Sequence, residues 1–235
     1  MTAQEWWGRL TTPAADPPGL VVVAAAALAL LLVAGPRTWP LVRHAVTLVH
    51  EGGHALAALV TGRRLHGVRL HGDSSGLTTS SGRRRGPGAV LTLAAGYPAP
   101  ALLGLACAAV LARGYVLVVL VGLLVALVLL LLQVRNLFGL WSVLVVGTLL
   151  VGVTWFLPDA WQQGAAHAVT WFLLLASARP VVELHAARRR TRGSDPAQLA
   201  ALTRVPTTVW TGVFLLVCCG AALLGGWLLV RPWLG

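Results

Sequence analysis

The chain has 235 residues, of which 57% are hydrophobic and only 11% are charged, and this composition excludes an ordinary soluble domain. The formal net charge is +11, with every basic residue an arginine. Because the arginines gather between apolar runs, we interpret them as loops facing anionic lipid rather than as a nucleic-acid surface. The three cysteines lie in apolar runs and form no Cys-x-x-Cys pair, so they indicate neither a disulfide framework nor a thiolate metal site.

Seven apolar segments of roughly bilayer-spanning length follow one another along the chain. The approximate predicted spans are 19–35, 38–62, 89–112, 115–132, 137–157, 164–178 and 207–230. The predicted fold is therefore an all-α polytopic membrane protein of about seven transmembrane helices. We expect residues 1–235 to form a single membrane-embedded domain, because no length remains for a soluble module.

The second predicted span contains the pattern His-Glu-x-x-His, formed by His50, Glu51 and His54. On a helix, two histidines four residues apart lie on nearly the same face and can hold one zinc ion, while the glutamate can take a proton from zinc-bound water. The alternative is that both histidines are buried polar residues that bond neighbouring helices. Ionisable residues inside a membrane are costly and usually functional, which favours the zinc site. Arg43 lies on the same stripe, and we expect it to extend towards the outer interface.

A long polar loop, 63–88, follows this span. Its alternating residues and its Gly-Asp-Ser-Ser-Gly sequence predict a small hairpin over Val68–Ser80. The edge of such a hairpin could hold an extended substrate by strand addition, or the hairpin could be an ordinary loop. In the next span, Pro98 and Pro100 predict a kink, and irregular backbone at that depth must face protein or water.

The arginine-rich loops predict the orientation of the chain. If 63–88 is cytoplasmic, seven spans also place the arginine-rich loop 179–204 in the cytoplasm and the loop around Asp159 outside. The predicted protein is then a multi-pass protein of a cell membrane, which we expect to be a bacterial plasma membrane, with its N-terminus and its hairpin both cytoplasmic.

A catalytic zinc ion needs a third protein ligand besides the two histidines. Asp195 would lie on the cytoplasmic side with the motif, and is our candidate for this ligand. Its alternative role is a helix N-cap, because Pro196 follows it and Gln198 lies three residues on. Other polar groups predicted on the correct side are Glu183, Asp73 and Asn136, whereas Asp159 belongs to the opposite side.

Several of these segments together resemble the M50B-like branch of the site-2 protease metallopeptidases. They are the motif span, the glycine-rich hairpin, Ala94-Ala95-Gly96-Tyr97, Arg135-Asn136-Leu137-Phe138-Gly139 and Ser194-Asp195-Pro196. The resemblance implies that His50 and His54 are zinc ligands and that Glu51 is the catalytic base. Better-known site-2 proteases carry the third ligand in an Asn-Pro-Asp-Gly or Leu-Asp-Gly motif on a later span. The nearest match here, 136–139, has no aspartate, so the third ligand stays open between the candidates above.

The first functional hypothesis is an intramembrane zinc metalloprotease that hydrolyses peptide bonds of membrane proteins or peptides, with Zn²⁺ as cofactor. The second is a non-catalytic membrane scaffold or metal-binding pseudoprotease, which the missing aspartate motif favours. The third is a transporter that uses His50 and Glu51 as a proton or metal relay, although the sequence has no internal repeat and no matching pair of interrupted helices. The expected surroundings are the lipid bilayer and a membrane-associated substrate, with no nucleic acid, and the sequence leaves the oligomeric state open.

Overall fold

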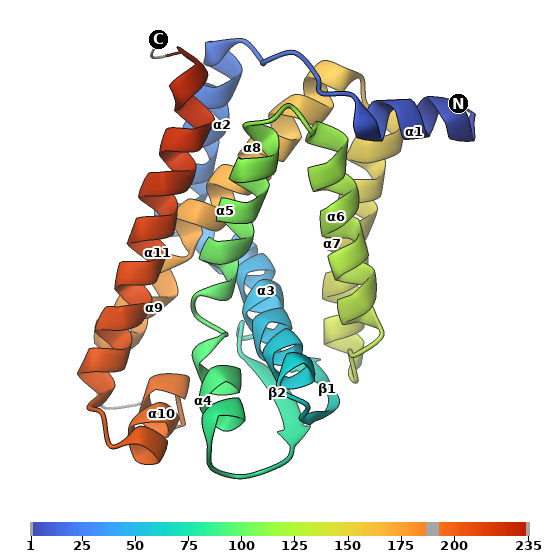
Figure 1. Ribbon diagram of the computed structural model, residues 1–235. Helices are drawn as coiled ribbons and strands as arrows, with labels where there is room; N and C mark the ends of the chain where they lie inside the picture. The colour runs from blue at the N-terminus through green and yellow to red at the C-terminus, as the bar shows by residue number, and fades with distance from the viewer. Residues whose placement is uncertain (1, 187–192, 234–235) are drawn as a thin grey trace.

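The computed structural model describes residues 2–186 and 193–233, which form a bundle of helices with one two-stranded sheet (Figure 1). The first half comprises α1 (Ala3–Thr11), α2 (Gly19–Ala34), α3 (Trp39–Val60), β1 (Arg64–Leu70), β2 (Gly76–Ser81), α4 (Pro87–Ala94) and α5 (Ala99–Leu111). The second half comprises α6 (Val116–Leu131), α7 (Leu137–Phe156), α8 (Asp159–Ala176), α9 (Ala178–Ala186), α10 (Asp195–Thr203), α11 (Thr207–Val230) and a 3-10 turn (Arg231–Trp233). The arginines at 188–190 and 192 of the predicted 179–204 loop lie outside the described residues.

Each predicted span coincides with helix, but the helices are not seven uninterrupted crossings. Among the described residues, α7, the α8–α9 pair and α11 are each long and apolar enough to cross a membrane. Two further pairs qualify only when joined: α2 with α3, bent by 102°, and α4 with α5, bent by 73°. The structure thus gives three to five candidate spans, with α6 as a shorter apolar helix, and the seven-span count is not confirmed. The bend before α5 occurs beside Pro98 and Pro100, as predicted for prolines that interrupt a helix.

The two ends of α6 show that the N-terminus and the hairpin lie on opposite sides of the bundle. Just before α6, the backbone carbonyl of Gly114 accepts a hydrogen bond from the Ala14 N–H. Just after α6, the carbonyl of Gln133 accepts one from the Val68 N–H of β1. The 16 residues of α6 separate these contacts by about 24 Å. Because α2 and α3 lead the chain in succession from one end to the other (Figure 1), the prediction that N-terminus and hairpin share one side is wrong.

The predicted hairpin is confirmed, and the turn between α6 and α7 holds it in place. Strands β1 and β2 pair in antiparallel register, with Val68 opposite Thr78. Both backbone groups of Val68 bond to this turn, one to Gln133 and one to Arg135. The Asn136 side chain accepts from the Leu70 N–H at 3.1 Å and donates to the Leu70 carbonyl at 2.6 Å, so it continues the sheet as a neighbouring strand would.

Small residues let α3 approach the break between α4 and α5. A Cβ atom built on Gly53 would lie 2.5 Å from the Ala99 Cβ and 2.8 Å from the Ala95 carbonyl oxygen, so glycine is required for this packing. On the other side of α4 lies α10, whose Leu199 is fully buried in an apolar cluster with Val181 and Phe214. This cluster brings the start of α10 to the face of α3 that carries the histidines.

Candidate metal centre

His50 and His54 converge on one point, as expected for residues one turn apart on α3. Their Nε2 atoms lie 3.0 Å apart, and their ring planes meet edge to face at 84°. His54 is buried, with 7% of its surface exposed. Its Nδ1 lies 2.6 Å from the Thr92 carbonyl of α4, and because a carbonyl only accepts hydrogen bonds, Nδ1 carries the proton. In the neutral ring the lone pair is then on Nε2, which is the atom that faces His50.

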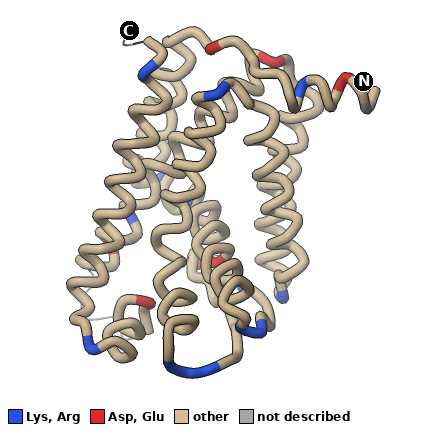
Figure 2. The backbone as a smooth tube through the Cα atoms, viewed as in Figure 1, with Lys and Arg blue, Asp and Glu red and all other residues tan. Residues whose placement is uncertain are grey.

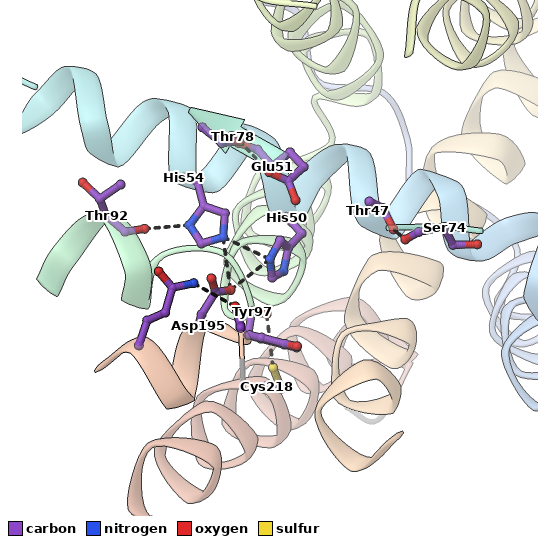
Figure 3. Close-up of polar contacts among 12 residues, drawn as sticks. Thr47, His50, Glu51, His54, Ser74, Thr78, Thr92, Tyr97, Asp195 and Cys218 are labelled. Carbon is purple, nitrogen blue, oxygen red and sulfur yellow. Dashed lines mark hydrogen bonds and ion pairs between the residues drawn. The ribbon is translucent and has the colours of Figure 1, made fainter. Parts of the chain in front are cut away.

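Asp195 completes this group from a position 141 residues further along the chain (Figure 3). Its Oδ2 lies 3.2 Å from the Nε2 atom of His50 and 3.2 Å from that of His54. The alternative prediction that Asp195 caps α10 is wrong, because Ser194 occupies the N-cap position and Asp195 is the first helical residue. Gln198 likewise turns away and donates its side-chain N–H to the Gly193 carbonyl.

The three atoms form a triangle with edges of 3.0, 3.2 and 3.2 Å, which fits the ligand set of a zinc ion. In a tetrahedral site with ligand distances of about 2.0–2.1 Å, the edges between ligand atoms are about 3.3–3.4 Å. Two imidazole nitrogens and one carboxylate oxygen are the donor set of a catalytic zinc site that leaves one position open. His50, His54 and Asp195 are also the group whose possible ligand atoms all lie within 4.8 Å of one another in the described chain.

Gly96, in the break between α4 and α5, forms part of the wall of this triangle. A Cβ atom at this position would collide with Nε2 of His54 and lie 2.6 Å from Nε2 of His50. Only glycine leaves room there for both imidazoles and for whatever they hold. Tyr97 follows, with its ring edge to face against His50 at 4.7 Å and stacked on Phe214.

The Asp195 carboxyl is ionised in this setting, as a metal ligand must be. Burial alone would raise the pKa of Asp195. When the imidazoles of His50 and His54 are protonated, their hydrogen bonds and positive charge outweigh burial and bring the pKa of Asp195 well below its ordinary value.

Glu51 is buried beside the triangle, with 3% of its surface exposed, and the hairpin holds its carboxylate. The Thr78 hydroxyl lies 2.5 Å from Glu51 Oε2 and 3.2 Å from the Glu51 backbone carbonyl, so β2 is fastened to this turn of α3. At Gly76, a Cβ atom would collide with Oε1 of the same carboxylate. Gly76, the first residue of β2, therefore allows the strand to pass directly over Glu51.

A cavity of about 970 Å³ contains all four groups. Its walls are α3, the hairpin from Ser74 to Ser80, α4 and the start of α10. Such a volume is typical of a small-molecule or peptide site. The cavity extends along α3 from Arg43 to His54 and towards Arg63 and Arg84.

The remaining predicted ligand candidates have other partners. Asn136 bonds to the backbone of β1, as described above. Asp73 lies in the hairpin turn and accepts from the Ser75 hydroxyl at 2.6 Å, and these hydrogen bonds lower its pKa. Asp159 lies at the opposite end of the bundle as predicted, paired with Arg9.

Glu183 of α9 also has partners other than the triangle, since it pairs with Arg179 and Arg43. Arg43 therefore lines the cavity, and the prediction that it extends to the outer interface is wrong.

Sequence reasoning assigned no site role to Thr78, Thr92, Gly96 or Tyr97. Thr92 contributes through its backbone carbonyl, for which side-chain identity gives no signal. Gly96 and Tyr97 belong to the segment Ala94-Ala95-Gly96-Tyr97, which contributed to the family resemblance. That resemblance was the one sequence signal that could have pointed to them.

Comparison with known proteins identifies the family of the chain. A family model described as Peptidase M50B-like matches residues 23–225, which is most of the chain and includes every residue of the triangle. No curated protein matches, and neither does any solved structure. The chain belongs to the M50B-like peptidase family.

Proposed function

We propose that this protein is an intramembrane zinc metalloprotease that hydrolyses peptide bonds of membrane-associated proteins or peptides. The observation that carries the proposal is the triangle of His50, His54 and Asp195, with the Glu51 carboxylate in the same cavity. A two-histidine, one-carboxylate site with an adjacent glutamate is the arrangement that zinc hydrolases use.

In the proposed mechanism the protein residues hold the metal and move one proton. A zinc ion bound by His50, His54 and Asp195 would supply Lewis-acid chemistry, acidifying water and polarising the substrate carbonyl. Glu51 takes the proton of the attacking water and delivers it to the nitrogen of the leaving amine. Because Thr78 donates to Oε2, Oε1 is the carboxylate oxygen left to carry that proton. The Thr92 carbonyl keeps the His54 ring oriented throughout.

The hairpin supports a role in holding the substrate. Within the described residues β2 pairs with β1 alone, so one edge of β2 has no strand partner. Residues of β2 also line the cavity beside Glu51. An unwound, extended substrate segment could add to this edge through backbone hydrogen bonds, which would place its peptide carbonyl near the metal.

The charge distribution supports an orientation in which the hairpin end faces the cytoplasm. Arginines cluster around the hairpin and the α6–α7 and α10–α11 turns, at the lower end in Figure 2. The described residues there are Arg63, Arg64, Arg69, Arg83, Arg84, Arg85, Arg135 and Arg204. By the positive-inside rule we infer that this end is cytoplasmic and that the N-terminal helix α1 lies on the outer side of a bacterial plasma membrane.

Cleavage by matched zinc-loaded proteins tests the proposal. Purified wild type and Glu51→Gln would be loaded with zinc, assayed for bound metal, and incubated in detergent micelles with a library of quenched fluorescent peptides. We expect about one zinc per chain in both proteins and cleavage by the wild type only, with a loss of roughly 10²–10⁴-fold or more in the variant. Equal cleavage by both proteins would refute the assignment of Glu51, and zinc binding without any wild-type cleavage would identify a non-catalytic metal protein.

A further inference from the structure

Arg43 lies in the same cavity as the triangle, two turns of α3 before His50. Its guanidinium pairs with Glu183 of α9 at 3.4 Å, and 39% of its side chain is exposed. The residue lines the cavity together with Thr47 and His50, which follow it on the same face of the helix.

The charges around Arg43 do not balance. Glu183 also accepts a hydrogen bond from Arg179 at 3.0 Å, so one carboxylate faces two guanidinium groups. Arg179 is further engaged by the Val33 carbonyl and by the Trp39 ring, 4.5 Å from its centroid. In the part of the chain that the structure describes, Glu183 is the only carboxylate within ion-pair distance of either arginine. One positive charge remains, and it faces the cavity at Arg43.

The two carboxylates that line the cavity itself are bonded to other groups. Glu51 is bonded to Thr78, and Asp195 faces the two histidines. Together they would balance the double charge of a zinc ion, so among the described residues the only carboxylate left for Arg43 is Glu183, which it shares with Arg179. A guanidinium in a partly enclosed, low-dielectric site binds a carboxylate strongly, because its parallel N–H groups match the two oxygens.

We propose that Arg43 forms a substrate subsite that binds a carboxylate of the bound peptide. The proposal rests on the peptidase function proposed above. Seven residues of helix separate Arg43 from His50 by about 10.5 Å along the axis. An extended peptide advances about 3.3 Å per residue, so the carboxylate belongs about three residues from the bond to be cleaved. It is either the side chain of an aspartate or glutamate or the free C-terminus of a short product-side segment.

Peptide binding to zinc-loaded Glu51→Gln protein tests this subsite without requiring cleavage. One peptide series is amidated at its C-terminus and carries a single glutamate at the second to fifth position on either side of the central bond. Each member is matched by a peptide with glutamine in its place. A second series has neutral side chains and ends at those positions in either a free carboxylate or an amide. The first series reports a side-chain carboxylate and the second a C-terminal one.

We expect one position at which the acidic peptide binds roughly tenfold more tightly or better than its neutral match, as for a hydrogen bond to a charged group. Adding Arg43→Gln should abolish this ratio, whereas adding Arg63→Gln, which removes an arginine at the other end of the cavity, should preserve it. The absence of an acid preference at every position, or an equal preference in the Arg43→Gln protein, would overturn the proposal.

A second variant and a second readout keep the result interpretable. If Arg43→Gln protein does not fold, Arg43→Lys keeps the charge but loses the fork that reaches Glu183 and a peptide together. We expect its preference to fall several-fold, and an unchanged preference would count against the subsite. Wild-type cleavage of the neutral peptides is measured in parallel. If the wild type cleaves nothing, the peptidase function fails, while the binding ratios still decide whether Arg43 selects a carboxylate.

Discussion

Two aspartates at opposite ends of the bundle occupy the same local position, the first residue of a helix beside a proline. Asp159 begins α8 and pairs with Arg9 of α1, with 84% of its side chain exposed. Asp195 begins α10, with 15% of its side chain exposed, and faces two histidines of α3. The comparison shows that local sequence specifies a helix start in both cases, whereas tertiary packing alone decides which aspartate belongs to a site.

The largest expected difference between the two ends concerns metal binding. Losing a residue that only orients a metal ligand typically lowers metal affinity roughly 10–100-fold. We predict that Asp195→Ala lowers zinc affinity by more than this, because it removes a ligand itself. Asp159→Ala should leave the affinity unchanged. Competition against a fluorescent chelator measures both, and equal affinities of the two variants would mean that Asp195 is not a ligand.

The second largest expected effect, also on zinc affinity, concerns Gly96 beside the triangle. Gly96→Ala places a methyl group against both imidazoles, so we expect zinc affinity to fall roughly 10–100-fold, as for other changes that misorient ligands. Gly152→Ala in α7 is the matched control, since a Cβ atom there meets nothing within 4 Å. The same chelator competition applies, and an unchanged affinity for Gly96→Ala would show that the triangle tolerates displacement.

Substitution of Thr78 should have a smaller effect, and only on kcat. Thr78→Val removes the donor to Glu51, so we expect kcat to fall about tenfold, in keeping with a hydrogen bond to a charged group. Zinc affinity should not change, and Thr78→Ser should recover most of the rate because it restores the hydroxyl. A valine variant with wild-type kcat, or a serine variant as slow as valine, would show that the hydroxyl does not position the base.

The smallest expected effect is on folding stability and concerns Asp159, at the end of the bundle opposite the triangle. Asp159→Asn removes an exposed ion pair with Arg9, and such pairs contribute less than about 1 kcal/mol to folding. Unfolding in mixed micelles should therefore shift only slightly. A destabilisation of several kcal/mol would show that the docking of α1 on α8 depends on this pair.

Much of the fold was readable from the sequence because its signals are local. Apolar runs located α2 to α8 and α11, and the alternation after Arg63 located the hairpin, whereas α1, α9 and α10 lie outside the predicted spans. The interruption near Pro98 followed from backbone chemistry at one position. The count of seven spans assumed that each apolar run crosses the membrane once, and the structure, with three to five candidate spans among the described residues, does not confirm it. The 102° bend between α2 and α3 depends on packing and has no such local signal.

The residues of the site likewise include some with a local sequence signal and some without one. His50, Glu51 and His54 form a local pattern, because helix geometry alone brings them to one face. Asp195 joins them through the burial of Leu199 against α9 and α11, and its sequence neighbours suggested a cap instead. Thr92 acts through a backbone carbonyl, which no residue type reveals.

X-ray absorption spectroscopy of the zinc-loaded protein tests the central claim most directly. We predict that the zinc ion is coordinated by two imidazole nitrogens and by carboxylate and water oxygens at about 2.0–2.1 Å, with one oxygen contribution lost in Asp195→Ala. A shell containing sulfur at about 2.3 Å, or one unchanged by that substitution, would contradict it.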